Sequence, residues 1–160
     1  MTKNGKEAPE KQEDKKETPE FEEEVSETHH TVSIDGQEIA YTAKAGTLVL
    51  KDDEGEPKAS VFYVAYTKDD VEDPAQRPIT FSFNGGPGSS SVWLHLGVLG
   101  PRRVLMDDEG NPLPPPFELV NNAYSLLDVT DLVFIDPVST GYSRPVPGED
   151  AKQFHGVKQD

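Results

Sequence analysis

The chain has 160 residues, a formal net charge of −15, 34% hydrophobic residues and no cysteine. The length suits one ordinary domain, and the negative balance argues against nucleic acid or anionic membranes as partners, because no basic surface is present to bind phosphate. Without cysteine the fold depends on its core rather than on disulfides or thiolate-bound metal. No run of sequence approaches the roughly 20 apolar residues of a membrane span.

The first 28 residues are rich in lysine, glutamate and proline. Such a segment buries too little apolar surface to offset the entropy lost on ordering, which predicts a disordered acidic tail over 1–28. A docking segment for a basic partner is the alternative. The segment has no apolar run typical of a secretory signal, so we expect a cytoplasmic location, with secretion or a periplasmic location open if the start is mis-assigned. His29-His30 lacks a third ligand and does not predict a metal site.

Apolar and polar residues alternate after the tail, from about Thr31, which is typical of half-buried strands. Asp35-Gly36 and the acidic run 52–55 supply the residues of tight turns. We expect an antiparallel meander with short loops, followed by a surface loop over 69–78. The expected strands cover 32–34, 39–41, 47–50 and 59–67.

Residues 79–83 predict a strand that runs straight into the glycine-rich segment 84–91, Asn-Gly-Gly-Pro-Gly-Ser-Ser-Ser. A short helix is expected over 92–96. Ser90 and Ser91 are candidates to cap its start, and Gly97 with Gly100-Pro101 would end it.

The second half of the chain predicts one more hairpin and one buried strand. Segments 103–106 and 117–120 would form the hairpin, with four prolines in its loop, and 125–127 a helical turn. Residues 131–136 place four apolar residues between two acids, the pattern of a parallel central strand. Residues 151–160 indicate the beginning of a helix.

Two acidic runs, 52–57 and 107–112, have nearly the same sequence. A calcium-binding loop needs glycine at its sixth position and glutamate at its twelfth. Both runs have glycine at the fourth position, so they predict turns rather than metal sites.

The glycine-rich segment allows three readings from its residues alone. Backbone N–H groups before a helix can hold phosphate, but Pro87 removes one donor and no Gly-Lys-Ser/Thr or G-x-G-x-x-G pattern is present. Alternatively, a glycine loop after an early strand can supply one donor of an oxyanion hole. The third possibility is a tight turn without chemistry.

The segment 84–91 resembles the N-G-G-P-G-x-S-S signature of serine carboxypeptidases, and further likenesses follow in the family's order. They are Leu99-Gly100-Pro101, the run 121–126, the run 136–143 (similar to D-x-P-x-G-x-G-F/Y-S), and 154–160, which resembles the approach to the nucleophile. The likeness covers roughly 79–160. It implies a partial α/β-hydrolase fold of the α/β class, in which the antiparallel meander leads into central sheet strands. The expected division is a tail over 1–28 and part of an α/β-hydrolase domain over 29–160.

The resemblance also implies residue roles. Gly86 matches the glycine whose backbone N–H faces the oxyanion, and Asn84 and Gly85 match positions that bind the C-terminal carboxylate of the substrate. The implied reaction is hydrolysis of C-terminal peptide bonds through an acyl-enzyme, with a peptide or protein C-terminus as substrate and no cofactor or metal. The chain departs from the family pattern at Ser82 (often Trp), Ser89 (Cys in secreted relatives) and Val98 (Glu).

The G-x-S-x-G elbow that carries the catalytic serine does not occur in the sequence. The resemblance places serine, aspartate and histidine after Asp160, so the chain alone is predicted to be inactive. His95 and His155 match no catalytic position and are expected to be partly buried or at the surface. Two alternatives stay open: a non-catalytic binding protein, and a fragment of a proline-iminopeptidase-like hydrolase, which Asn84 disfavours because those enzymes carry histidine before the glycines.

Overall fold

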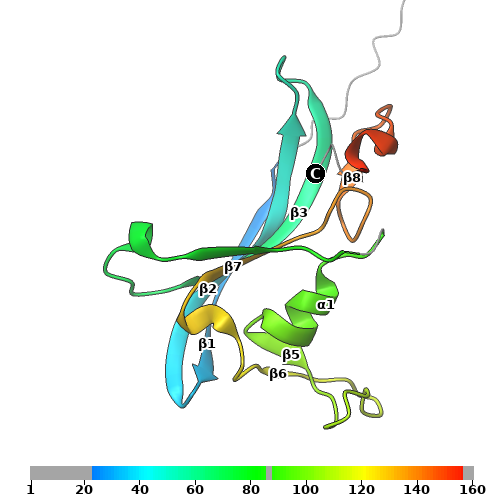
Figure 1. The fold of residues 1–160 in the computed structure, drawn as a ribbon. Helices are drawn as coiled ribbons and strands as arrows, with labels where there is room; N and C mark the ends of the chain where they lie inside the picture. The colour runs from blue at the N-terminus through cyan, green and yellow to red at the C-terminus, as the bar shows by residue number, and fades with distance from the viewer. Residues whose placement is uncertain (1–22, 86–87, 157–160) are drawn as a thin grey trace, which may run out of the picture.

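The computed structural model describes residues 23–85 and 88–156. This part of the chain contains a six-stranded sheet in the order β1-β2-β3-β7-β4, with β8 paired to β3, and a two-stranded sheet of β5 and β6. Figure 1 shows the long strands β1–β3, with β7 next to β3 in the same sheet and the helix α1 beside β5 and β6. Within the described residues no helix has the length and apolar character needed to cross a bilayer.

The first three strands form the predicted antiparallel meander: β1 (Val25–Ile34), β2 (Gln37–Lys51) and β3 (Pro57–Lys68). Asp35 and Gly36 both have positive φ, 49° and 78°, as a two-residue hairpin turn with right-handed twist requires. One prediction was wrong, because segments 39–41 and 47–50 belong to a single strand. Residues 42–46 continue the pairing with β1 on one side and β3 on the other.

Ordered structure begins earlier than the sequence predicted. The expected tail ran to Thr28, but Val25 already pairs with Gly46, and residues 25–28 are regular strand. Their side chains are exposed, so no hydrophobic alternation marks them. A Cβ at Gly46 would lie 2.5 Å from the carbonyl oxygen of Glu24, which shows how closely the two strands run. Residues 1–22, the rest of the expected tail, lie outside the described residues.

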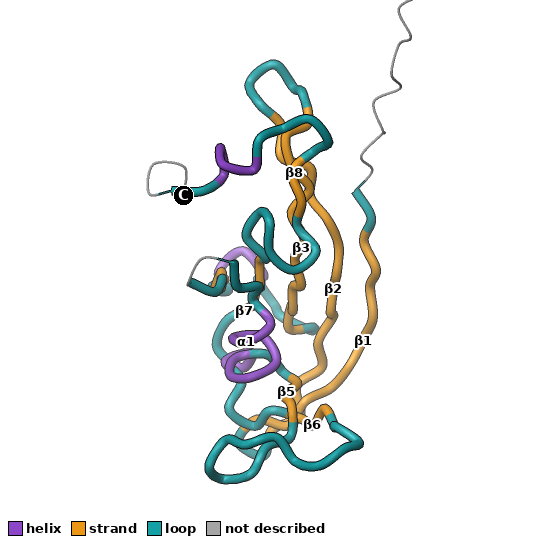
Figure 2. Tube along the Cα trace, turned by 90° about the vertical axis from the view of Figure 1, so that its right-hand side faces the viewer, coloured by secondary structure: helices purple, strands orange, loops and turns teal. Residues whose placement is uncertain are grey.

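A single cluster of buried side chains forms the core between the meander and the helical segment 92–99. Tyr41 of β2 and Phe134 of β7 are its largest fully buried members. Leu94 of α1 (Val92–Leu94) and Leu99 of η2 (His95–Leu99) pack against the cluster. Figure 2 shows α1 on one side of β1–β3, so one face of the sheet is covered there. The core comprises Val32, Ile34, Ile39, Tyr41, Tyr66, Leu127, Leu132 and Phe134.

The buried strand β7 (Asp131–Ile135) lies inside the sheet, as its sequence indicated. The sequence predicted parallel neighbours, but only one of its two neighbouring strands is parallel. β4 (Ile79–Ser82) pairs with it in parallel, while β3 pairs with it antiparallel, so the sheet is mixed.

The remaining elements are short. The predicted hairpin is present as β5 (Arg102–Val104) and β6 (Leu119–Asn121), and the helical turn as η3 (Leu126–Asp128). The predicted helix 92–96 continues to Leu99 as a wider turn, closed by a 3.0 Å bond from the Gly100 N–H to the His95 carbonyl. Further short elements are η1 (Pro74–Gln76), β8 (Arg144–Pro145) and η4 (Ala151–Phe154), the last standing where the helix 151–160 was expected.

The two similar acidic runs are turns of the same design, as predicted. Asp52 Oδ1 accepts the backbone N–H groups of Glu54 and Glu56 at 3.1 and 2.8 Å. Asp107 Oδ1 accepts those of Glu109 and Asn111 at 3.0 and 2.8 Å. The backbone hydrogen bonds from Glu56 and Asn111, respectively, lower the pKa of the two aspartates.

A partly buried ion pair links the loop after β3 to the start of β7. Arg77 Nε lies 2.7 Å from Asp131 Oδ1, with side-chain exposures of 10% and 19%. The same guanidinium donates to the carbonyl oxygens of Leu127 and Asp128, at 2.5 and 3.3 Å. One guanidinium therefore donates to three acceptors, the Asp131 carboxylate and two backbone carbonyls.

Arg77→Ala is expected to lower the free energy of unfolding by about 3 kcal/mol, because the partly buried Asp131 carboxylate loses its charged partner and two carbonyls lose a donor. Lys44→Ala is the matched control: its pair with Glu27 spans 3.1 Å at exposures of 45% and 46%, and such a pair contributes about 0–1 kcal/mol. Urea unfolding followed by circular dichroism measures both. Equal losses in the two variants would contradict the assignment.

Candidate active site

The glycine-rich segment and the segment 136–143 leave the sheet at the same edge. They follow β4 and β7, which are parallel and paired with Ser82 opposite Phe134. In open sheets with parallel strands, ligands bind where loops leave the carboxyl ends of the strands. The fold therefore places the predicted chemistry at a position suited to a binding site.

Two of the three predicted site residues can be located. Asn84 is partly exposed and its Nδ2 donates to the carbonyl oxygen of Gly85 at 3.2 Å. Gly85 is exposed, and a Cβ built on it would meet no atom within 4 Å. Both groups are thus accessible. Gly86 lies outside the described residues, so its place facing an oxyanion stays a prediction.

Ser91 stands at the start of α1 but does not cap it with its side chain, which corrects the expected capping by Ser90 or Ser91. Its hydroxyl donates instead to the carbonyl oxygen of Ile135, at the end of β7. Its backbone N–H donates to Asp136 Oδ1 at 2.9 Å. The end of the glycine-rich segment is therefore bound to the neighbouring strand.

Asp136 is the residue of this region that the sequence analysis did not single out. It is 8% exposed, and its carboxylate accepts the N–H of Ser91 at 2.9 Å and that of Tyr142 at 3.3 Å. One side chain thus joins the glycine-rich segment to the turn after β7. An acid closing a buried strand directly before a turn-rich segment is the signal that could have drawn attention to it.

Gly141 allows this contact by its lack of a side chain. Its φ is +46°, and a Cβ there would lie 1.7 Å from Asp136 Oδ2 and 3.1 Å from the Cβ of Ser90. Segments 90–91, 136 and 141 therefore approach one another so closely that only glycine fits at position 141 without a shift of its neighbours.

Asn122 and Ser125, within the family-like run 121–126, close the end of η2. Asn122, 1% exposed, donates through Nδ2 to the carbonyls of Val98 and Gly100, both at 2.8 Å. Ser125 Oγ donates to the Leu99 carbonyl at 2.8 Å. The last carbonyls of a helix have no partner within it, so these side chains fix the helical segment rather than take part in chemistry.

His95 of η2 is partly buried and packs against two core residues, Tyr66 and Phe134. Its ring stacks on Phe134, with centroids 4.6 Å apart and planes 23° apart, and Nε2 lies 2.6 Å from the hydroxyl of Tyr66. Burial lowers the pKa of His95 to about 4, against a smaller opposing effect of the Asp136 carboxylate. Burial also raises the pKa of Tyr66. A partly buried imidazole is the environment that the sequence predicted for His95.

The lowered pKa of His95 predicts a pH-dependent stability. Between pH 6.5 and about 4 the unfolded chain binds a proton that the folded chain does not, so this contribution is complete above pH 6.5 and is lost as the pH falls. The stability difference between wild type and His95→Gln should shrink over that range by up to about 3 kcal/mol. Urea unfolding at each pH measures it. Tyr66→Phe, which keeps the imidazole buried, should retain the wild-type slope; a pH-independent difference for His95→Gln would contradict the assignment.

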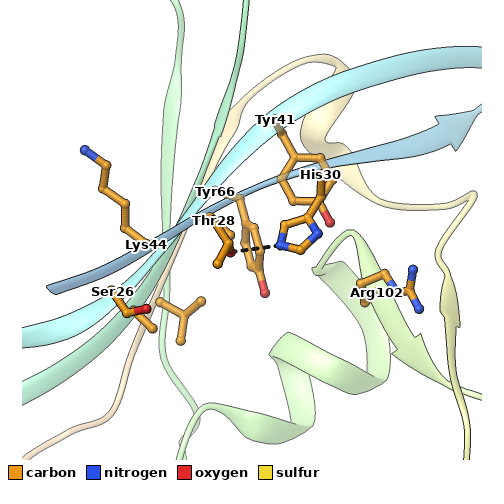
Figure 3. A pocket seen from close by; sticks show the side chains of 10 residues that line it. Ser26, Thr28, His30, Tyr41, Lys44, Tyr66 and Arg102 are labelled. Carbon is orange, nitrogen blue, oxygen red and sulfur yellow. Dashed lines mark hydrogen bonds between the residues drawn. The ribbon is translucent and has the colours of Figure 1, made fainter.

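A cavity of about 420 Å³ lies elsewhere, on the face of the meander (Figure 3). Its lining includes Tyr41, Tyr66 and His30, whose Nε2 lies 2.8 Å from the hydroxyl of Thr28. No lining residue belongs to 84–91 or 136–143, so this cavity is separate from the site above. Within the described ranges no three histidine, cysteine, aspartate or glutamate side chains group as metal ligands.

A glycine-rich loop after a parallel strand, anchored to the turn of the next strand, is an arrangement suited to acyl-transfer hydrolases. Comparison with known proteins defines the class further. The family model for serine carboxypeptidase matches residues 35–157, a longer stretch than the sequence motifs indicated. The chain belongs to the serine carboxypeptidase family.

Individual relatives agree with this assignment. Serine carboxypeptidase-like 2 of Arabidopsis thaliana is 30% identical over 113 residues, covering 65% of this chain and 24% of the relative. The pheromone-processing carboxypeptidase KEX1 of Saccharomyces cerevisiae is 33% identical over 104 residues, covering 62% of this chain and 13% of the relative. The crystal structure of Kex1(delta)p, a prohormone-processing carboxypeptidase from that yeast, matches with a TM-score of 0.50 at 31% identity, over 63% of this chain and 20% of that chain. The chain thus spans about a quarter or less of these relatives.

Proposed function

We propose that this chain supplies the oxyanion and substrate-carboxylate loop of a serine-type carboxypeptidase, which hydrolyses C-terminal peptide bonds through an acyl-enzyme. The observation that carries the proposal is the accessible segment Asn84-Gly85 at the carboxyl end of β4, in a chain of the serine carboxypeptidase family. We also propose that the chain forms part of an α/β-hydrolase fold. The mixed sheet supports this proposal.

Each part of the loop has a proposed chemical task. The backbone N–H of Gly86 donates to the oxygen that becomes negative in the tetrahedral intermediate, and such a donor is worth about 10²–10³ in rate. The side-chain amide of Asn84 and the N–H of Gly85 donate to the carboxylate at the substrate's C-terminus. Among the described residues, Asn84 Nδ2 donates to the Gly85 carbonyl at 3.2 Å, a bond that it would give up for this contact.

The nucleophile and its partners come, in this proposal, from sequence beyond the segment that the relatives share with this chain. Two facts support this: the printed sequence has no G-x-S-x-G, and the match covers 24% of the plant relative. Without a serine nucleophile, histidine base and aspartate, only residual catalysis is possible. We therefore expect the 160-residue chain alone to be inactive.

The test compares the complete protein with the 160-residue chain, using a fluorophosphonate that labels activated serines and two peptides. One peptide is blocked at its N-terminus with a free carboxylate, and the other has a free N-terminus and a C-terminal amide. We expect the complete protein to be labelled at one serine and to release the last residue of the first peptide only, while the chain alone does neither. Labelling of the chain alone would contradict the proposal.

The same experiment decides the alternatives. A proline-iminopeptidase-like enzyme would act on the peptide with the free N-terminus. A non-catalytic binding protein, which the missing serine elbow favours, would leave both peptides intact and the complete protein unlabelled.

A further inference from the structure

We propose that Asp136 is a positioning residue: its carboxylate holds the end of the glycine-rich loop in the place that oxyanion binding requires. The inference rests on the proposed function of that loop. It adds a residue that neither touches the substrate nor belongs to the loop itself.

The first support is the pair of contacts made by the carboxylate. Oδ1 accepts the N–H of Ser91, which ends the loop, and Oδ2 accepts the N–H of Tyr142, in the turn after β7. The hydroxyl of Ser91 is bound as well, to the carbonyl of Ile135. The end of the loop is therefore held by both its backbone and its side chain at a single point, the end of β7.

The second support is that the backbone of Asp136 is itself held by hydrogen bonds to neighbouring residues. Its N–H donates to the carbonyl of Phe62 at 3.0 Å, and its carbonyl accepts the hydroxyl of Ser143 at 2.6 Å. Ser143 is fully buried, and its Oγ also accepts the N–H of Phe62 at 2.8 Å. The anchor is thus bound to β3, in the middle of the sheet.

The third support is the chemical nature of the contact. An ionised carboxylate offers two oxygen acceptors, whereas an amide would present an N–H group to one of the two backbone donors. Among the described residues no lysine or arginine forms an ion pair with Asp136. The two backbone N–H groups therefore provide the hydrogen bonds that a buried charge needs, and such charge-assisted bonds are stronger than neutral ones.

Gly86 lies five residues before Ser91 in the sequence, so the proposal predicts that the placement of its oxyanion donor depends on how the end of the loop is held. A misplacement of about 1 Å can cost about 10² in rate. An oxyanion contact is made fully only in the transition state, so the loss should fall on kcat more than on KM.

The test uses Asp136→Asn in the complete protein and in the 160-residue chain. In the complete protein we expect kcat, per serine titrated with fluorophosphonate, to fall about 100-fold, with a much smaller change in KM. In the chain we expect the amide hydrogens of Ser91 and Tyr142 to exchange at least about tenfold faster relative to the amide of Leu132 inside β7.

Asp131→Asn is the matched control. Asp131 stands at the other end of β7 and also accepts a backbone N–H, from Lys68 at 3.1 Å. It should lower stability without changing kcat or the relative exchange of Ser91. Should Asp136→Asn fail to fold, Ser143→Ala, which keeps the carboxylate but releases its backbone, should give the same two effects at smaller size.

Unchanged relative exchange at Ser91, or an unchanged kcat in an active complete protein, would overturn the inference. A wild-type complete protein without peptidase activity would instead overturn the proposed function. In that case the exchange experiment still decides whether Asp136 anchors the loop.

Discussion

Replacing Gly141 with valine is expected to lower the free energy of unfolding by about 3–5 kcal/mol. A Cβ at this position would lie 1.7 Å from Asp136 Oδ2, so the carboxylate or the turn has to move. Moving them leaves a buried charge without its backbone donors and adds the cost of overpacking. Urea unfolding of the chain, followed by circular dichroism, measures the loss.

Gly110→Val separates this steric effect from the cost of a side chain at positive φ. Gly110 has φ +82°, and nothing lies within 4 Å of its Cβ position, so the variant bears only a backbone cost of about 1–2 kcal/mol. The φ of Gly141, +46°, is closer to the left-handed region that other residues can adopt. If Gly141→Val lowers the free energy of unfolding no more than Gly110→Val does, the close contact at Gly141 does not contribute to stability.

Replacing Gly86 with valine in the complete protein is expected to lower kcat by about 10²–10³, with a much smaller rise in KM. A branched side chain prevents the close approach of the backbone N–H to the tetrahedral intermediate, because glycine alone leaves that space free. Steady-state kinetics on a peptide with a free carboxylate measures both constants.

Gly97→Val is the control. Gly97 belongs to η2 rather than to the loop, and a Cβ built on it would meet no atom within 4 Å. It should leave kcat close to wild type. Equal effects of Gly86→Val on kcat and KM, or none, would remove Gly86 from the proposed task.

Features set by neighbouring residues were predictable from the sequence. The hairpin at Asp35-Gly36 and the acidic turns depend on residues a few positions apart, so local chemistry was sufficient. The alternation of β3 and the apolar run of β7 likewise identified both strands.

Features set by distant partners were not predictable. Strand 25–28 is stabilised by backbone pairing with β2, which leaves no trace in exposed side chains. The sequence around Ser91 predicts that its hydroxyl caps the following helix. In the structure the hydroxyl donates instead to the carbonyl of Ile135, 44 residues away in the sequence. The candidate site depends on the same distinction. The motif predicts substrate binding by Asn84 and Gly85, whereas the hydrogen bonds of Asp136 depend on which two segments the sheet brings together.

The side-by-side register of β4 and β7 has a consequence for how this region tolerates length changes. Side chains alternate between the two faces of a strand, so removing one residue from 79–82 would turn Asn84 toward the opposite face. Deletions and insertions here should therefore be far more harmful than in the proline-rich excursion between β5 and β6, where added chain has open solvent to occupy.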